Sequence, residues 1–561
     1  MPSLLQAWAM PAALLAIVNI SATWYQLVSH EVPEPYLDEY FHVPQAQKYC
    51  RLDYSWDPKI TTPPGLYIIT KFLKPLLGCD TSSLRVLNAG AICLICILCY
   101  GILQLSRARN SPTQSQRKKN DDEKTDNRPE NQDSTILLDA HSALNIALFP
   151  PLFFFSALYY TDVLSTLFVL LNYSAYMKKS TIAGNIFENM NVISIGIIAL
   201  LFRQTNIFWV AVFPAGLAII DALKANGPPR DKSRAEGVTT VFQSSWREGV
   251  VYDCSVQDAE PRDYILLLLS VVMAALRKPL LVIQVVIPYA ALLAAFGGFV
   301  LWNGSVVLGD KSAHTATIHL PQMLYVWPYI AFFSAPLVVG PLLGPLVPHL
   351  PKRLQLLCSS LNASREAVLP GVLVAVLFIV GSLIAIHFNT IIHPYTLADN
   401  RHYVFYVFRI FRQRPVLRYL AAPIYFFCAW LTVQALGPPS NRKADTTRKR
   451  GGRPTTDEAD RQPCQISFIV IWLATTALSV ITAPLVEPRY FIIPWIIWRL
   501  HVPYVPASLS KESVTGRVPY DMRLSLETVW LLAINAAVCY TFLYRGFTWP
   551  SEPGNTQRFI W

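Results

Sequence analysis

Long apolar runs recur along the whole chain, and they restrict its possible folds more than any other feature. Each run approaches the roughly 20 residues that an α-helix needs to cross the hydrocarbon core of a bilayer. The composition agrees, because 53% of the 561 residues are hydrophobic and only 15% are charged, whereas soluble domains carry about 25% charged residues. The sequence therefore predicts an all-α polytopic membrane protein in which residues 1–561 form one membrane-embedded domain.

Hydropathy along the chain predicts about 12 to 14 membrane-spanning helices. The first has no Lys or Arg before it and no clear small-residue cleavage site after it, so we expect an uncleaved signal anchor. Segment 263–277 could instead lie along the membrane surface. The candidate spans are 4–28, 84–104, 141–160, 162–178, 183–202, 205–222, 280–302, 321–345, 367–388, one crossing within 403–436, 465–483, 490–502 and 525–545.

Many basic residues lie in three long polar segments, 105–140, 223–262 and 437–464. Two shorter basic turns occur at 178–179 and 352–353. All five fall on one side of the membrane if the spans alternate, and the positive-inside rule assigns that side to the cytosol. We expect the three long segments to be flexible cytosolic loops. Because the basic residues behind the net charge of +11 lie in loops between spans, no nucleic-acid partner is expected.

The opposite face of the membrane collects compact polar motifs from several separate loops. The largest is an acidic loop over residues 29–83, which the same alternation places in the lumen. Charged motifs that converge on one surface are what an active site on a membrane scaffold requires. The residues on this face are Asp38, Glu39, His42, Asp57, Asp162, the run Arg203-Gln204-Thr205-Asn206, and the motifs at 309–314, 393–403 and 487–490.

The stretch EPYLDEYFH, residues 34–42, contains the two carboxylates best suited to catalysis. Pro35 can begin a helix, which would place Asp38 and His42 on one face at i, i+4. Neighbouring aromatic residues would shield the carboxylates from bulk water, and partial burial raises the pKa of a carboxyl group and improves it as a base. The alternative is that these acids belong to a solvated linker. We expect Asp38 and Glu39 to form a catalytic pair.

Cysteine and histidine spacing predicts no metal site. Cys50 and Cys79 flank the acidic loop and could pair in an oxidising lumen, and the sequence leaves the paired and free states open. The histidines at 314 and 319, and those at 393 and 402, do not have the spacing of a zinc site. We therefore expect neither a metal nor a cofactor.

Six motifs stand out in order along the chain: EPYLDEYFHVPQAQKYC, WDPKITTPPGLY, FRQTNI, GDKSAH, HPYTLADNRHY and EPRYFIIP. Together they closely resemble the dolichyl-phosphate-glucose-dependent α-1,2-glucosyltransferase family of the endoplasmic reticulum. The resemblance covers nearly the whole chain, and the three long basic segments are its variable parts. Six such motifs in the right order are hard to obtain by chance.

The resemblance implies a GT-C type glycosyltransferase fold in the endoplasmic reticulum membrane, with a luminal active site. It implies transfer of the third and terminal glucose from dolichyl-phosphate-glucose. The acceptor would be the diglucosylated, nine-mannose oligosaccharide on dolichyl pyrophosphate, before its use in N-glycosylation. The expected partners are these two lipid-linked substrates and the membrane lipids.

The family's β-linked donor and α-linked product imply a single inverting displacement with one carboxylate base. Because enzymes of this type place that acid in the first luminal loop, we expect Asp38 as the base, with Glu39 as the nearest rival and Asp57 third. No general acid is required, since the departing lipid phosphate carries its own charge. The further candidates for binding the donor phosphate or the substrates are His42, Trp56, Tyr67, Arg203, Lys311, His314, His393, Asp399, Arg401, His402, Glu487 and Arg489.

Within this set, the roles differ. Trp56 and Tyr67 are expected to stack on a sugar, whereas Arg203 and Arg489 could alternatively anchor to lipid headgroups. The residues expected to stabilise the phosphate are Arg489, Arg401, His393 and Lys311.

Two rival functions remain open. One is another dolichyl-phosphate-sugar transferase of the same fold, which would share an acidic first loop. The other is a polytopic lipid transporter, which predicts charges within spans and internal repeats. The sequence contains few such charges and no evident repeat.

Overall fold

The computed structural model describes residues 4–110, 130–180, 184–227, 237–311, 317–343, 349, 351, 370–437, 464–483, 485–505 and 520–561. α-Helices form most of this part of the chain, and one two-stranded antiparallel hairpin is the only sheet within it. The predicted all-α class is therefore confirmed.

Seven helices of the described chain are long and apolar enough to cross a membrane. They are α1 Leu4–Glu31, α4 Thr81–Asn110, α10 Phe213–Ala225 continued from η2 Phe208–Val212, α13 Pro279–Asn303, α19 Val372–Asn389, α21 Pro415–Gln434 and α25 Met522–Tyr544. An eighth crossing results if the bent pair of α6 with α7 and η1 counts as one span. The pair bends by 60°, because Pro150 and Pro151 lack the backbone donors that would continue the first helix.

Hydropathy over the whole chain predicts 12 to 14 spans, whereas the described residues contain seven or eight candidate spans. The shorter apolar helices at 186–200 and 466–480 are not counted among these candidates. Segment 321–345 does not form one helix, because Pro336 and Pro341 break it into short pieces. Segment 490–502 contains the nine-residue helix α24, of which every residue except the half-buried Ile493 is buried within the protein. Hydropathy does not distinguish an apolar run enclosed by other helices from one that faces lipid.

The remaining helices of the bundle are shorter. They are α6 Glu130–Ala147, α7 Pro150–Phe154, η1 Phe155–Ala157, α8 Thr161–Met177, α9 Ile186–Leu200, α14 Gln322–Phe333, α15 Ala335–Val338, α16 Gly340–Leu343, α23 Ile466–Val480 and α24 Ile492–Leu500. In the core, the ring of Phe149, just before α7, stacks on Trp495 of α24 at a centroid distance of 3.8 Å. The indole N–H of Trp495 also donates a hydrogen bond of 2.9 Å to Ser334, between α14 and α15.

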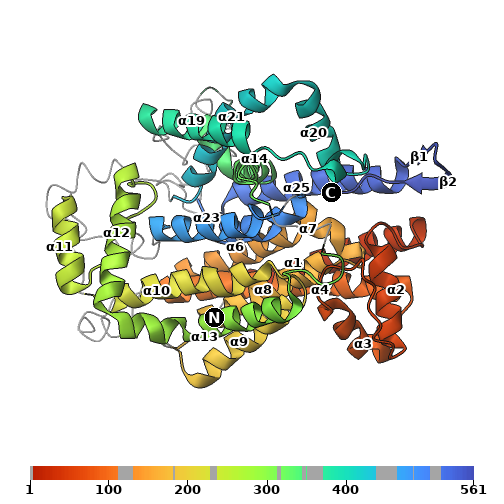
Figure 1. The fold of residues 1–561 in the computed structure, drawn as a ribbon, viewed down its shortest axis with the longest axis horizontal. Helices are drawn as coiled ribbons and strands as arrows, with labels where there is room; N and C mark the ends of the chain where they lie inside the picture. The colour runs from red at the N-terminus through yellow and green to blue at the C-terminus, as the bar shows by residue number, and fades with distance from the viewer. Residues whose placement is uncertain are drawn as a thin grey trace.

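Different elements cover the two ends of the bundle (Figure 1). The helices α2 and α3 and the hairpin of β1 and β2 lie at the right-hand end, whereas α11 and α12 lie at the left-hand end and run across the direction of the long helices. The bounds of these elements, and of the remaining short elements η4, η5 and α20, are α2 Glu39–Cys50, α3 Gly65–Leu77, α11 Val238–Glu248, α12 Pro261–Arg277, η4 Pro394–Leu397, α20 Tyr403–Gln413, η5 Pro488–Phe491, β1 Phe547–Trp549 and β2 Glu552–Gln557.

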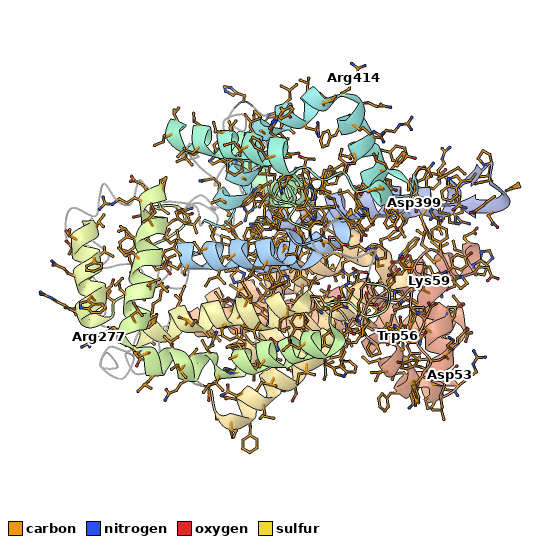
Figure 2. All side chains as sticks on the ribbon, viewed as in Figure 1. Asp53, Trp56, Lys59, Arg277, Asp399 and Arg414 are labelled. Carbon is orange, nitrogen blue, oxygen red and sulfur yellow. A yellow bond between two sulfur atoms is a disulfide. The ribbon has the colours of Figure 1, made fainter. Side chains whose placement is uncertain are left out.

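Several labelled side chains follow the same division, whereas Arg414 lies at the top of the view. Asp53, Trp56 and Lys59 lie at the right-hand end and Arg277 at the left-hand end (Figure 2). The segment 223–262, expected to be a flexible loop, contains the helix α11. The parts 111–129, 228–236 and 438–463 of the three long basic segments lie outside the described residues.

Residues 29–83 form a folded cap rather than an extended loop. The helices α2 and α3 lie within it, and the end of α1 and the start of α4 border it. A disulfide joins Cys50 to Cys79, with a Cα–Cα distance of 6.7 Å. Of the two states that the sequence left open, the structure has the paired one, and this bond ties the end of α2 to the residues that begin α4.

Candidate active site

The tight turn before α2 directs two adjacent carboxylates to opposite sides. Leu37 has a φ of +52°, a conformation that residues other than glycine rarely adopt. The amide N–H of Glu39 donates to the Tyr36 carbonyl at 3.2 Å, and that of Asp38 donates to the Tyr160 hydroxyl at 3.2 Å. As a result, Glu39 points into the protein and is fully buried, while the Asp38 side chain is 43% exposed.

Glu39 is held by a buried ion pair. Its two carboxylate oxygens accept hydrogen bonds from the Arg85 guanidinium at 2.9 Å and 2.6 Å. They also accept the backbone N–H groups of Tyr36 at 3.0 Å and Tyr159 at 2.6 Å. Each oxygen thus has two donors, so this carboxylate is saturated. Arg85 was not among the expected site residues. An ionised side chain near the start of a predicted span nevertheless indicates that a counter-charge lies close by.

Arg489 is the centre of the charge cluster that includes Asp38. Its guanidinium donates to Asp38 at 2.9 Å and forms an ion pair with Glu487 at 2.7 Å. The carboxylate of Asp162 lies 3.7 Å from the same guanidinium and forms an ion pair with Arg203 at 2.8 Å. Four segments far apart in the chain therefore bring three carboxylates and two guanidinium groups together. We call these five residues, Asp38, Asp162, Arg203, Glu487 and Arg489, the Arg489 cluster.

Accessibility differs within this cluster. The side chain of Asp38 is 43% exposed, compared with 2% for Asp162 and 12% for Arg489. One carboxylate oxygen of Asp162 is buried without a hydrogen-bond partner. Of the three acids, Asp38 is the one that a substrate can reach most directly.

The electrostatics of Asp38 correct one sequence-based expectation. Burial alone would raise the pKa of Asp38, as expected, but the charge of the Arg489 guanidinium and its hydrogen bond to the carboxylate outweigh that effect and hold this pKa below its usual value. Burial lowers the pKa of His42 to about 4, although Asp38 pulls it upward. Near neutral pH, Asp38 is therefore an ionised carboxylate and His42 a neutral imidazole.

His42 connects the cluster to the aromatic residues of the cap. Its Nδ1 lies 2.6 Å from the Tyr67 hydroxyl. Trp56 meets the ring of Tyr67 edge-on at 5.9 Å, and its indole N–H donates to the Ile60 carbonyl. Tyr67 is completely buried, so of these two aromatic residues only Trp56 has surface available for a sugar.

A second group of charges lies beside the first. Arg401 makes a two-pronged pair with Asp399, with Nη2 2.6 Å from Oδ2, and it donates to Gln557 at 3.0 Å. His402 lies 3.8 Å from the same Asp399 carboxylate. Arg401 is thus occupied by structural partners, and His402 lies at the same ion pair.

The C-terminal residues 557–561 hold both groups of charges in place, a role that the sequence did not predict. The Tyr36 hydroxyl donates to the Arg558 carbonyl at 2.8 Å and accepts the Arg558 amide at 2.7 Å. The ring of His402 contacts the carbonyl of Trp561 at 3.0 Å. In the sequence, the one indication of this role is that the aromatic residues Phe559 and Trp561 follow the polar hairpin.

Other expected residues lie apart from the cluster. The backbone N–H of Asp57 donates to the Gln45 side chain of α2 at 3.2 Å, and its carboxylate accepts the Lys59 amide at 2.9 Å. Lys311 donates to the Asn303 carbonyl, and His393 accepts the amide of Tyr395 at 3.2 Å. His314 lies outside the described residues. Within the described chain, no three His, Cys, Asp or Glu side chains are grouped so that they could hold a metal.

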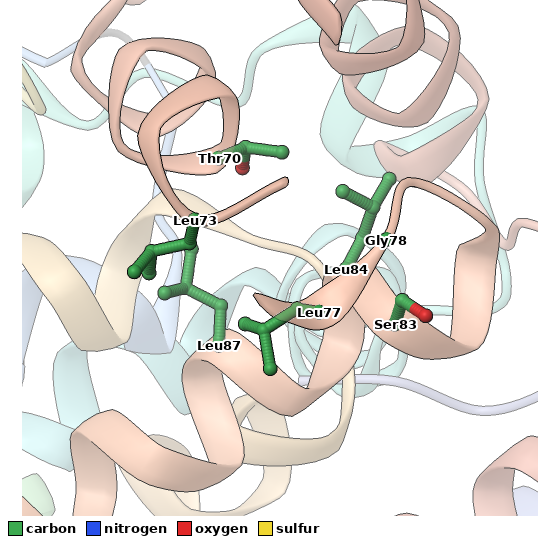
Figure 3. Close-up of a pocket in the computed structure, with 7 residues that line it drawn as sticks. All are labelled: Thr70, Leu73, Leu77, Gly78, Ser83, Leu84 and Leu87. Carbon is green, nitrogen blue, oxygen red and sulfur yellow. The ribbon is translucent and has the colours of Figure 1, made fainter. Parts of the chain in front are cut away.

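A small cavity lies between α3 and α4 (Figure 3). Its lining is mainly aliphatic, with Leu73, Leu77, Leu84 and Leu87 among the residues, and its volume is about 10 Å³. A cavity of this size holds at most one water molecule. It has no room for a sugar and is not part of the active site.

The Glu39 ion pair gives a first prediction. Replacing Glu39 by Gln would leave the buried Arg85 guanidinium without its counter-charge, and breaking a buried pair costs roughly 3–5 kcal/mol. We expect Glu39→Gln to lower the unfolding temperature of the purified protein markedly, whereas Asp38→Asn leaves it almost unchanged. Equal unfolding temperatures for the two variants would show that Glu39 is not a structural anchor.

Comparison with known proteins adds independent observations. Residues 32–500 match the model of the DIE2/ALG10 family. A relative from Aspergillus fumigatus is 39% identical and covers 100% of this chain and 98% of its own. A relative from Mus musculus is 31% identical over 99% of both chains. Both are named Dol-P-Glc:Glc(2)Man(9)GlcNAc(2)-PP-Dol alpha-1,2-glucosyltransferase. No solved structure matches. The chain belongs to the DIE2/ALG10 family.

Proposed function

We propose that this protein transfers glucose from dolichyl-phosphate-glucose to the diglucosylated Man9GlcNAc2 oligosaccharide on dolichyl pyrophosphate, forming the terminal α-1,2 linkage. The observation that carries the proposal is the accessible, ionised carboxylate of Asp38 beside the guanidinium of Arg489, at one end of a bundle of membrane-length helices. The family and the names of its members support the choice of substrates.

The reaction is one displacement at the anomeric carbon of the donor glucose. The acceptor hydroxyl oxygen forms the new bond while the bond to the phosphate oxygen breaks, and the hydroxyl proton moves to the carboxylate of Asp38. The leaving group is dolichyl phosphate, which keeps the bonding electrons. Attack from the face opposite the phosphate converts a β-linked donor into an α-linked product.

The base in this proposal is Asp38 rather than Glu39. Both oxygens of Glu39 already accept two donors each and are fully buried, so Glu39 has no free lone pair for a proton and no access to a substrate. Asp57 is half-buried, and within the described chain its recorded partners belong to its own loop and to α2. The depressed pKa of Asp38 keeps the base ionised.

Two cations suit the departing phosphate. Arg489 and Arg203 belong to the same cluster as the base, and charge-assisted hydrogen bonds from guanidinium groups to phosphate are short and strong. His402, beside Asp399, could donate a ring N–H to the same phosphate. Lys311 and His393 stay candidates for contacts farther from Asp38, and Trp56 for stacking on a sugar.

We further propose that the protein lies in the endoplasmic reticulum membrane with Asp38 on the luminal side. The disulfide between Cys50 and Cys79 fits an oxidising compartment. Arg277 lies at the end of the bundle opposite to Asp53 and Trp56, as the positive-inside rule requires of a cytosolic end.

Membranes containing the protein should transfer glucose to the defined lipid-linked acceptor from dolichyl-phosphate-glucose and not from dolichyl-phosphate-mannose. Transfer of mannose alone would instead support a different transferase of the same fold. No transfer from either donor, with the purified folded protein, would leave the lipid transporter as the better description.

Asp38→Asn should reduce kcat by about 10²–10⁴-fold, the usual contribution of a positioned general base. The fold should persist, because Glu39 and not Asp38 carries the buried pair. Asp53→Ala is the matched control, since Asp53 is an exposed carboxylate of the same cap, and we expect full activity. A fully active Asp38→Asn variant with an inactive Asp57→Asn variant would move the base to Asp57.

The pH dependence tests the role of Arg489. The base works only when ionised, so activity falls as the pH drops through the pKa of Asp38. Arg489→Gln removes the main charge that lowers this pKa, and the acid limb of the kcat/KM profile should move to higher pH. Arg51→Gln, which removes an exposed arginine of the cap, should leave the limb in place. An unmoved limb in Arg489→Gln would mean that another group is titrating.

Two engineered glycosylation sites test the sidedness. Asp53→Asn creates the sequon Asn-Tyr-Ser in the cap, and Gln243→Asn creates Asn-Ser-Ser in α11. In microsomes, we expect a glycosidase-sensitive increase in mass over the wild-type protein only for Asp53→Asn. An increase for Gln243→Asn instead would reverse the orientation and exclude a luminal Asp38.

A further inference from the structure

A basic helix, α20, begins at the end of the protein that contains Asp38. Arg409 and Arg412 lie in α20, Arg414 lies between α20 and α21, and Arg418 lies in the first turn of α21. Residues 403–434 contain no Asp or Glu. The positive-inside rule concentrates basic residues on the cytosolic side. Arg414 lies at the top of Figure 2, away from Arg277 at the left-hand end, so this run of four arginines calls for a separate reason.

Three contacts fix the position of α20. The helix begins directly after His402, whose ring contacts Trp561. The preceding residue, Arg401, donates to Gln557. In the same C-terminal segment, the backbone of Arg558 is hydrogen-bonded to the hydroxyl of Tyr36, which lies two residues before Asp38 in the chain. The start of α20 therefore belongs to the end of the bundle that contains the Arg489 cluster.

A hollow of about 380 Å³ opens between η4 and α20. Its lining consists of Leu397, Phe405, Arg409, Arg412 and Gln413. Arg409 and Arg412 are one helical turn apart and share a face. Both are exposed, and within the described chain neither has an ion-pair partner; Arg409 only lies over the ring of Phe405 at 5.9 Å.

The chemistry of the hollow fits a phosphorylated lipid. Two guanidinium groups without counter-charges favour phosphate oxygens, which they bind through paired, charge-assisted hydrogen bonds. Leu397 and Phe405 offer an apolar wall beside them. The exposed apolar residues Val407 and Ile410 of the same helix are suited to contact the acyl chains at a membrane surface.

We propose that this hollow binds the pyrophosphate of the lipid-linked oligosaccharide acceptor. The inference rests on the proposed function and names a second, separate anchoring site for its acceptor. The donor phosphate is attached to the reacting anomeric carbon, so it must lie within the Arg489 cluster beside Asp38. The acceptor pyrophosphate is separated from the reacting hydroxyl by the whole oligosaccharide, so it has to bind away from Asp38. Two arginines also match the two phosphates of the acceptor.

The double variant Arg409→Ala/Arg412→Ala tests the site by steady-state kinetics with both lipid-linked substrates. We expect the KM for the acceptor to rise about 10-fold or more, the usual effect of losing a charge-assisted hydrogen bond. The kcat at saturating acceptor and the KM for the donor should stay unchanged. The doubly lysine-substituted variant should recover part of the affinity, because it keeps the charge without the planar fork.

Arg414→Ala is the matched control, because Arg414 is exposed on the same basic stretch but does not line the hollow. An equal rise in acceptor KM for Arg414→Ala would show that the stretch attracts anionic lipid headgroups in general and would overturn the specific site. A changed KM for the donor alone would also overturn it. With a free oligosaccharide that lacks the lipid pyrophosphate, the double variant and the wild type should have the same KM.

Binding of dolichyl pyrophosphate alone separates the site from the reaction. The wild-type protein should bind this probe more tightly than the double variant, and more tightly than it binds dolichyl phosphate at the same hollow. If the wild type binds in this way but transfers no glucose, the proposed function fails and the pyrophosphate site stands. If it transfers glucose but the double variant binds the probe as well as the wild type, the site fails and the proposed function stands.

Discussion

The buried ion pair between Glu39 and Arg85 is the constraint on which the candidate active site depends. It draws Glu39 into the protein, where four donors surround its carboxylate. The chain accommodates this by the left-handed conformation of Leu37, which turns Asp38 to the opposite side. Two neighbouring acids of similar chemistry thereby receive different roles, one as an internal anchor and the other as an accessible carboxylate.

The environment of Asp38 is set by opposite effects of burial and charge. A recess at a membrane surface would by itself favour the neutral acid. Arg489 reverses that preference, and the same guanidinium also binds Glu487 and lies close to Asp162. A cation that keeps the base ionised is also in position to meet the phosphate of a lipid-linked donor. The Arg489 side chain therefore couples the base to the site of the leaving group, both of which an inverting displacement requires.

The C-terminal segment extends this arrangement beyond the residues that match the family model. Arg558 fixes Tyr36 in the turn before α2, and Gln557 and Trp561 hold the residues that precede α20. One segment thus joins the turn that carries Asp38 to the helix that carries Arg409 and Arg412. The donor and acceptor sites that we propose share this support, although they lie on different elements.

The sequence by itself determined the helical membrane class, the acidic cap between the first two long apolar runs and the charged motifs that the structure gathers around Arg489. These follow from composition, hydropathy and motif order, which are properties of the chain taken residue by residue. It could not determine how many apolar runs cross the membrane, because α24 is as apolar as a span but is enclosed by other helices. It also could not separate Asp38 from Glu39 or give the sign of the pKa shift of Asp38. Those depend on which side chains from distant segments, such as Arg85 and Arg489, lie within hydrogen-bond distance, and only the tertiary structure decides that.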